Sequence, residues 1–167
     1  MLRLSPSATE SMRRHAEAGY PLEICGFLVG CVEDGARVVH DAWPVRNAWE
    51  DDPDLRARML KAMEQAGGAS TERWESASEE RRFLISPEDT LAAMKRARQE
   101  KVDLIGVYHT HPNHPAIPSD FDRSAAWPEW SYVILSVREG RVAELRSWEV
   151  LDMDAPFTEE AVESPVL

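Results

Sequence analysis

The chain has 167 residues, of which 43% are hydrophobic and 29% are charged, and its formal net charge at pH 7 is −11. This length fits one domain with a core of its own, so no disulfide is needed to hold the fold together. The negative charge argues against nucleic acid as a partner, because no basic stripe is present. No apolar run approaches the roughly 18 residues that would span a bilayer, so we expect no membrane contact. Residues 1–6 are too short for a secretory signal, and the expected location is the cytoplasm.

The chain has two cysteines, Cys25 and Cys31, which lie in one apolar stretch. Two thiols on the same strand are poorly placed to form a disulfide with each other. We therefore expect both to be buried and reduced, and a disulfide or a ligand role is the alternative.

The first part of the chain predicts a helix followed by a β-hairpin. Residues 5–18 combine an N-cap Ser, a Pro in the first turn and apolar residues at helical spacing, and Gly19-Tyr20-Pro21 then ends the pattern. Residues 24–32 are continuously apolar, Glu33-Asp34-Gly35 has the composition of a turn, and residues 37–45 resume an extended pattern. We expect 24–32 to pair with 37–45.

A long polar segment follows at residues 47–82. It begins acidic, is helix-like over residues 54–65, contains Gly and Ser at residues 67–71, and ends with a charged run at 76–82. Segments of this length inside a domain are usually functional loops or partly disordered. A functional loop and a solvated insertion without a functional role are the two interpretations that remain open here.

The rest of the chain alternates between strands and helices. Residues 82–85 predict a short strand, and residues 86–101 predict a capped helix. The apolar, β-branched run at residues 102–108 predicts a buried strand. Residues 131–150 predict a second hairpin, and the acidic residues 152–167 predict a short edge strand or a loose tail.

Candidate metal ligands are concentrated between His109 and Asp122. Residues two apart on a strand face the same way, so His109 and His111 share one face at the end of the predicted strand. Prolines stiffen the loop that follows, and Ser119 then caps a helix that contains Asp122 and is expected to end near Trp127. Two imidazoles and one carboxylate suit a catalytic zinc, whose fourth position stays open for water. Zinc can activate that water as a nucleophile at neutral pH.

Each of these residues also has an ordinary structural explanation. Ser119 and Asp122 could be a helix cap and its partner, although capping does not exclude metal binding. His114 could be a fourth ligand, but we expect the loop prolines to turn it into solvent. His15 and His40 are interpreted as surface residues.

The pattern resembles the motif of the JAMM (MPN-plus) metalloproteases. That motif is an upstream Glu, then His-(Ser/Thr)-His followed by seven residues that begin with Pro, and then Ser-x-x-Asp. Here Thr110 fills the middle position, Pro112 follows the second His and Pro118 precedes the Ser. Residues 22–30 (L-E-I-C-G-F-L-V-G) resemble the family's strand that carries the catalytic Glu. The resemblance covers about residues 5–150.

The resemblance implies a prokaryotic-type, single-domain member of this family over residues 1–167. Its fold class would be α/β, with a mixed, curled β-sheet flanked by helices, as in the cytidine-deaminase-like folds. The polar insertion at about 47–82 lies where better-known members carry a substrate-guiding insertion, and the acidic tail covers about 152–167. A long second insertion after Asp122 is missing, which puts linkage-specific recognition of ubiquitin chains in doubt.

The resemblance also implies a role for each motif residue. His109, His111 and Asp122 would bind one Zn²⁺ per chain. Glu23 would be the general base, although by itself it reads as an ordinary carboxylate at the start of a strand. Ser119 would stabilise the oxyanion.

Proteolytic members of this family cut peptide or isopeptide bonds after the C-terminal Gly-Gly of ubiquitin-like proteins, and some prokaryotic relatives trim small sulfur-carrier proteins. The resemblance therefore implies a zinc metalloprotease with a ubiquitin-like or sulfur-carrier protein as substrate, and it leaves monomer or homodimer open. Two alternatives remain. One is a non-catalytic MPN-like scaffold, and the other is a zinc hydrolase of short peptides or small molecules.

Overall fold

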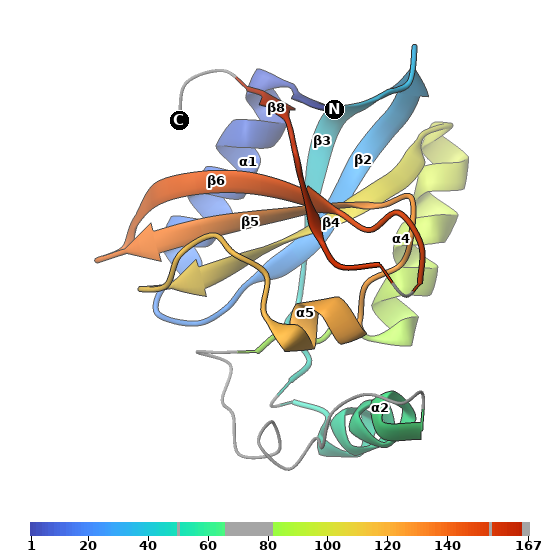
Figure 1. Ribbon diagram of the computed structural model, residues 1–167, viewed down its shortest axis with the longest axis vertical. Helices are drawn as coiled ribbons and strands as arrows, with labels where there is room; N and C mark the ends of the chain where they lie inside the picture. The colour runs from blue at the N-terminus through green and yellow to red at the C-terminus, as the bar shows by residue number, and fades with distance from the viewer. Residues whose placement is uncertain (50, 66–81, 154, 165–167) are drawn as a thin grey trace.

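The computed structural model describes residues 1–49, 51–65, 82–153 and 155–164, which build a curled, mixed sheet flanked by helices (Figure 1). The strand order is β7-β6-β5-β4-β2-β3-β1-β8. The strands are β1 (Leu2–Leu4), β2 (Cys25–Glu33), β3 (Ala36–Val45), β4 (Asp103–Pro112), β5 (Ser131–Arg138), β6 (Arg141–Glu149), β7 (Thr158–Glu160) and β8 (Val162–Glu163). The helices are α1 (Pro6–Gly19), α2 (Pro53–Gln65), α4 (Pro87–Glu100) and α5 (Asp120–Ser124). The expected fold class is confirmed.

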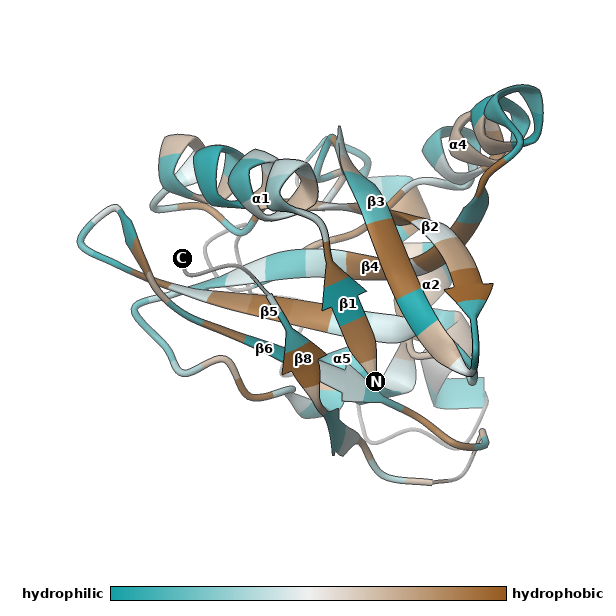
Figure 2. Cartoon of the chain, turned by 90° about the horizontal axis from the view of Figure 1, so that it is seen from above, coloured by the Kyte–Doolittle hydropathy of each residue, from teal (hydrophilic) through white to brown (hydrophobic). Residues whose placement is uncertain are grey.

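Helices cover the two faces of this sheet. Adjacent residues of β2 point to opposite faces, so Leu28 packs in one core with α1, and Phe27 packs in a second core with Ala93 and Ala97 of α4. Hydrophobic residues lie along the strands between α1 and α4 (Figure 2). Strand β4 is therefore covered on both sides, which suits its apolar sequence.

The two edges of the sheet meet at a buried carboxylate. Strands β7 and β8 lie on opposite edges but follow one another in the chain, so the sheet curls until it is nearly closed. Glu160 is only 3% exposed. Its Oε1 accepts a hydrogen bond of 2.9 Å from Arg37, which also bonds to Glu149 at 3.0 Å. Its Oε2 accepts from the hydroxyls of Ser131 and Ser147. This network joins β3 to β5, β6 and β7.

Most predicted elements are confirmed. Ser5 and Ser86 cap α1 and α4, and Lys101, in the left-handed conformation, ends α4. Both predicted hairpins form, as β2–β3 and β5–β6. The helix expected over residues 54–65 is α2, whereas residues 67–71 of the insertion lie outside the described part of the chain. The acidic tail forms the short edge strands β7 and β8.

Four structural expectations are wrong. Residues 82–85 form no strand, because the side chain of Asn47, rather than a neighbouring strand, accepts the hydrogen bond of the Leu84 amide. Helix α5 ends at Ser124, earlier than expected. Cys31 is partly exposed rather than buried because it lies near the turn of the hairpin, toward the edge of the core. His15 is half-buried, and its Nδ1 lies 2.9 Å from the hydroxyl of Tyr108.

Other expectations about single residues are confirmed. Cys25 is buried, and both cysteines are free thiols. His40 and His114 are exposed. Among the described residues, no helix is long and apolar enough to cross a bilayer.

The network at Glu160 generates a stability prediction. We expect Glu160→Gln to lower the free energy of unfolding by about 3 kcal/mol, because it removes the more deeply buried of the two carboxylates that pair with Arg37. Urea denaturation measures this change. The matched control is Glu159→Gln on the same strand, whose exposed pair with Arg146 should contribute less than about 1 kcal/mol. Equal effects of the two substitutions would contradict a special role for the buried carboxylate.

Candidate metal centre

The end of β4 presents two histidines beside the start of β2. The α-carbon of His109 pairs with that of Cys25 across the two antiparallel strands. One residue further on, Thr110 donates its amide to the carbonyl of Ile24 at 3.1 Å, and its hydroxyl accepts from the Ile24 amide at 3.0 Å. These two bonds extend the pairing toward Glu23, the residue before Ile24.

The structure brings together the three predicted ligands. The Nε2 atoms of His109 and His111 lie 3.1 Å apart. Asp122 Oδ1 lies 3.1 Å from His109 Nε2, and Oδ2 lies 3.7 Å from His111 Nε2. Ligands about 2.0–2.1 Å from a tetrahedral zinc would be about 3.3 Å from one another. The observed separations bracket this value, so the buried cluster could hold a metal ion.

Asp122 is held in place by the start of α5. The amide and the hydroxyl of Ser119 each donate to Asp122 Oδ2 at 2.6 Å, and the amide of Asp122 donates back to the Ser119 hydroxyl at 3.3 Å. This is a capping box, so the structural explanation of the two residues is correct. The same bonds aim the carboxylate at the imidazoles, so capping and metal binding are compatible.

The two imidazoles are oriented in different ways. His111 Nδ1 lies 2.9 Å from the carbonyl oxygen of Pro115, and a carbonyl can only accept, so Nδ1 carries the proton. The lone pair on Nε2 then faces the cluster, as metal binding requires. His109 Nδ1 has no hydrogen-bond partner among the described residues. Instead the ring of Phe83 stacks on His109, with centroids 4.4 Å apart.

Burial and mutual attraction set the charges of the cluster. Burial lowers the pKa of His109, which keeps its imidazole neutral. Burial also opposes the charge of His111, but Asp122, Glu23 and the carbonyl of Pro115 together raise the pKa of His111. Burial alone would raise the pKa of Asp122, yet the two imidazoles hold it well below its usual value. The site therefore offers one carboxylate and at least one neutral imidazole at neutral pH.

Glu23 lies on the wall of a cavity that adjoins the cluster. The cavity has a volume of about 400 Å³, and its lining includes His111, His114 and Ser119. Glu23 is 7% exposed, and burial raises its pKa to about 8 against the opposing effect of His111. The exposed His114 is not one of the three clustered donors.

A second, apolar cavity adjoins the cluster from another side. Its volume is about 570 Å³, within the roughly 300–1,000 Å³ usual for ligand pockets. His109 and Asp122 form part of its wall. Apolar and aromatic residues supply most of the rest, including Phe27, Met59, Phe83, Met94, Val107, Phe121, Trp127, Trp130 and Tyr132. The cluster thus borders a polar and an apolar space.

Several residues that support the cluster carry no recognisable signal in the sequence. The side chain of Asn47 donates to the carbonyls of Glu23 and Arg82 and accepts from the amides of Trp49 and Leu84, all at 2.9–3.0 Å. It thereby ties the start of β2 to the segment before α4. Nothing in the sequence marks this Asn. The sequence also gives no signal for the stacking of Phe83 on His109, which joins residues far apart in the chain, or for the bond from His111 to Pro115, which depends on the path of the loop.

Comparison with known proteins identifies the relatives of this chain. Prokaryotic homologs of the JAB domain match residues 5–151. Desampylase from Haloferax volcanii is 31% identical over 147 residues, which cover 81% of this chain and 80% of that protein. A probable TtuB-protein conjugate cleaving protease from Thermus thermophilus is 39% identical over 46 residues, covering 27% of this chain and 31% of that protein.

A solved structure agrees with this family. A protein from Salinibacter ruber is 31% identical, with a TM-score of 0.65, and the match covers 98% of this chain and 91% of that one. The family match spans most of the described strands and includes both histidines and Asp122. The chain therefore belongs to the prokaryotic homologs of the JAB domain, and the resemblance to the JAMM (MPN-plus) family is confirmed.

Proposed function

We propose that this protein is a zinc metalloprotease that hydrolyses the peptide or isopeptide bond after the Gly-Gly tail of a ubiquitin-like or sulfur-carrier protein. The observation that carries the proposal is the buried cluster of His109, His111 and Asp122 beside Glu23. The names desampylase and conjugate cleaving protease, given to two relatives, support a protein conjugate as the substrate.

We assign the metal to the three clustered side chains. The ligands would be His109 Nε2, His111 Nε2 and a carboxylate oxygen of Asp122, holding one zinc. Zinc in such a site acts as a Lewis acid and lowers the pKa of a water molecule. The proton on His111 Nδ1 is held by the carbonyl of Pro115, which fixes the ring in the orientation that ligation needs.

Glu23 is assigned as the general base. Its carboxylate takes a proton from the attacking water while the water oxygen forms a bond to the substrate carbonyl carbon. When the carbon–nitrogen bond breaks, the same group returns the proton to the leaving nitrogen, which departs as an amine. The anchoring of the Glu23 backbone by Asn47 and of Ile24 by Thr110 keeps this carboxylate at the wall of the polar cavity.

Ser119 is assigned as the oxyanion donor. Its hydroxyl donates to Asp122 Oδ2 in the structure, but its backbone amide donates to the same oxygen. The amide can therefore keep Asp122 in place while the hydroxyl turns to the negative oxygen of the tetrahedral intermediate.

The shape around the cluster suits a thin peptide tail on a folded protein. Glycine has no side chain to clash in a narrow groove, so a Gly-Gly tail can reach a recessed centre. Met94 and Trp127, which are 58% and 66% exposed, line the apolar cavity and offer a surface to the rest of the substrate.

The insertion lies where it can contribute to that surface. Leu55 and Leu60 of α2 pack in one cluster with Phe121, the neighbour of Asp122. Met59 of the same helix lines the apolar cavity. We therefore assign the described part of the insertion to substrate guidance, and shortening the insertion should raise KM without loss of metal.

The first residue-specific prediction from this proposed function concerns Glu23. Glu23→Gln should keep the bound zinc and lose at least about a hundredfold in kcat, because the amide cannot accept the proton. Cleavage of fusions to a ubiquitin-like protein ending in Gly-Gly, followed by mass spectrometry, gives kcat, and elemental analysis gives the zinc content. Glu100→Gln, an exposed carboxylate at the end of α4, is the matched control and should be unchanged. Full activity of Glu23→Gln would contradict the assigned base.

Removal of the metal tests the proposal as a whole. Dialysis against a chelator should abolish cleavage, and added zinc should restore it. A metal-free preparation that still cleaves would overturn the zinc mechanism. Zinc binding at the cluster without cleavage of any such conjugate would favour the scaffold or the small-substrate alternative.

A second prediction concerns Ser119. Ser119→Ala should lower kcat by about a hundredfold, which is typical of a lost oxyanion donor, and should leave KM nearly unchanged. Zinc content should stay near that of the wild type, because the amide of residue 119 still holds Asp122. A loss of zinc that accounts for the loss of activity would show that Ser119 acts only through Asp122.

A third prediction concerns Thr110, which is fully buried. Thr110→Val keeps the shape but removes the acceptor of the Ile24 amide, so we expect unfolding free energy to fall by about 1–3 kcal/mol. The kcat should also fall, because Glu23 is less firmly aligned with His111. Thr110→Ser restores the hydroxyl and should recover kcat. Equal kcat values for the Val and Ser variants would contradict the positioning role.

A further inference from the structure

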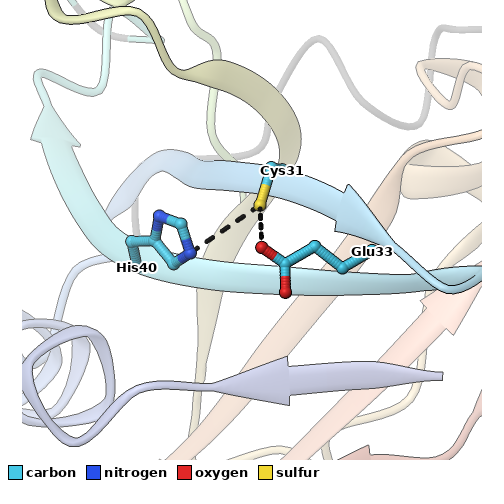
Figure 3. Close-up of side chains that lie close together, drawn as sticks. All are labelled: Cys31, Glu33 and His40. Atoms are coloured by element: carbon cyan, nitrogen blue, oxygen red, sulfur yellow. Dashed lines mark hydrogen bonds between the residues drawn. The ribbon is translucent and has the colours of Figure 1, made fainter.

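A second cluster of metal-ligating side chains lies on the β2–β3 hairpin. The Sγ of Cys31 lies 3.2 Å from Glu33 Oε1 and 3.7 Å from His40 Nε2. Figure 3 shows the thiol pointing to both side chains. One sulfur, one oxygen and one nitrogen donor thus lie within 4.8 Å of one another.

The strand geometry explains why these three side chains meet. Cys31 and Glu33 are two residues apart on β2, so they share a face. On β3, Val39 pairs with Gly30 and Asp41 pairs with Val29, which leaves His40 as the extra residue of a β-bulge. Bulges re-aim side chains, and this one turns the imidazole toward the thiol.

The bulge is held by the start of α1. The carbonyl oxygen of His40 accepts hydrogen bonds from the hydroxyls of Ser5 at 2.7 Å and Ser7 at 3.2 Å. Ser5 is also the N-cap of α1. The backbone position of His40 is therefore fixed by a helix that packs on the core.

We propose that Cys31, Glu33 and His40 form a second metal site that binds Zn²⁺ or a similar borderline divalent transition metal. A thiolate with an imidazole and a carboxylate favours such ions over Mg²⁺ and Ca²⁺, which prefer oxygen ligands. A tetrahedral zinc would hold sulfur about 3.6 Å from nitrogen or oxygen, given the usual bond lengths. The observed 3.7 Å and 3.2 Å need only a small rotation of the exposed Glu33 side chain.

This site is separate from the proposed catalytic centre. Cys25 is the residue of β2 that pairs with His109, and Cys31 lies six residues further along, about 20 Å away at the rise of a strand. One ion cannot contact both clusters. The bound metal would instead join β2 to β3 beside the turn at Asp34-Gly35 and stabilise the hairpin.

A reactive thiol is the other role that Cys31 could have. The hydrogen bond to Glu33 raises the pKa of the Cys31 thiol, and the nearby carboxylate of Asp103 adds to this effect. A thiol kept protonated is a poor nucleophile. The distances among the three donors, in contrast, match those of a metal site.

Cobalt is the probe that separates the two metal sites. A thiolate bound to Co²⁺ gives an intense charge-transfer absorption in the near ultraviolet, whereas the cluster of His109, His111 and Asp122 has no sulfur. We expect metal-free protein to bind a second equivalent of Co²⁺ together with this band. Cys31→Ser should lose the band and one equivalent. His40→Asn should weaken this site by more than tenfold, because even outer partners of a ligand contribute about 10–100-fold.

Two control variants complete the experiment. Cys25→Ser should keep the band, because that thiol points at the carbonyls of Val45 and Arg46. Asp122→Asn should weaken binding at the catalytic cluster and also keep the band. Wild-type protein that shows no band, or a Cys31→Ser variant that keeps it, would overturn the proposal. These spectra do not depend on cleavage, so they leave the proposed protease function untouched.

Discussion

The alignment of β2 with β4 is the constraint on which the candidate centre depends. The bonds between Ile24 and Thr110 join segments 86 residues apart in the sequence. They bring Glu23 to the cavity that His111 also lines. The hydroxyl of Thr110 is buried, so an unpaired Ile24 amide would be costly, and the register has little freedom to slip. The third clustered residue, Asp122, comes from outside the sheet, and its position is set separately by the capping box of α5.

The electrostatics of the cluster favour a shared cation. Two imidazole nitrogens lie 3.1 Å apart in a buried place, and the tautomer set by Pro115 turns the lone pair of His111 Nε2 toward its neighbour. Such a contact is favourable only when a proton or a metal lies between the nitrogens. The buried Asp122 has the same need, because a carboxylate away from water requires positive charge nearby. Burial of this carboxylate without a cation would destabilise the fold, whereas a divalent ion would compensate its charge.

Local sequence signals predicted the elements of the fold well, and long-range contacts explain what they missed. The caps at Ser5 and Ser86, the hairpin turns and the box of Ser119 and Asp122 involve neighbours in the chain, so their chemistry is visible in the sequence. At residues 82–85 the side chain of Asn47 takes the place of a partner strand, and no local pattern in the sequence predicts that contact. In α4, alanines face the core while Leu91 and Met94 are exposed, because a helix close to a sheet needs small side chains.

The two candidate metal clusters are built in the same way and differ in what holds the third donor residue. Each takes two side chains at i and i+2 on a strand and a third from a neighbouring element. In the buried cluster the third ligand, Asp122, is bonded through its own carboxylate by Ser119, so the ligand atom itself is fixed. In the hairpin cluster Ser5 and Ser7 fix only the backbone of His40, and its side chain remains exposed. Preorganisation of the ligand atom lowers the entropic cost of binding, and solvent access allows exchange. The buried cluster is therefore suited to retaining a bound ion, and the hairpin cluster to exchanging an ion with the surroundings.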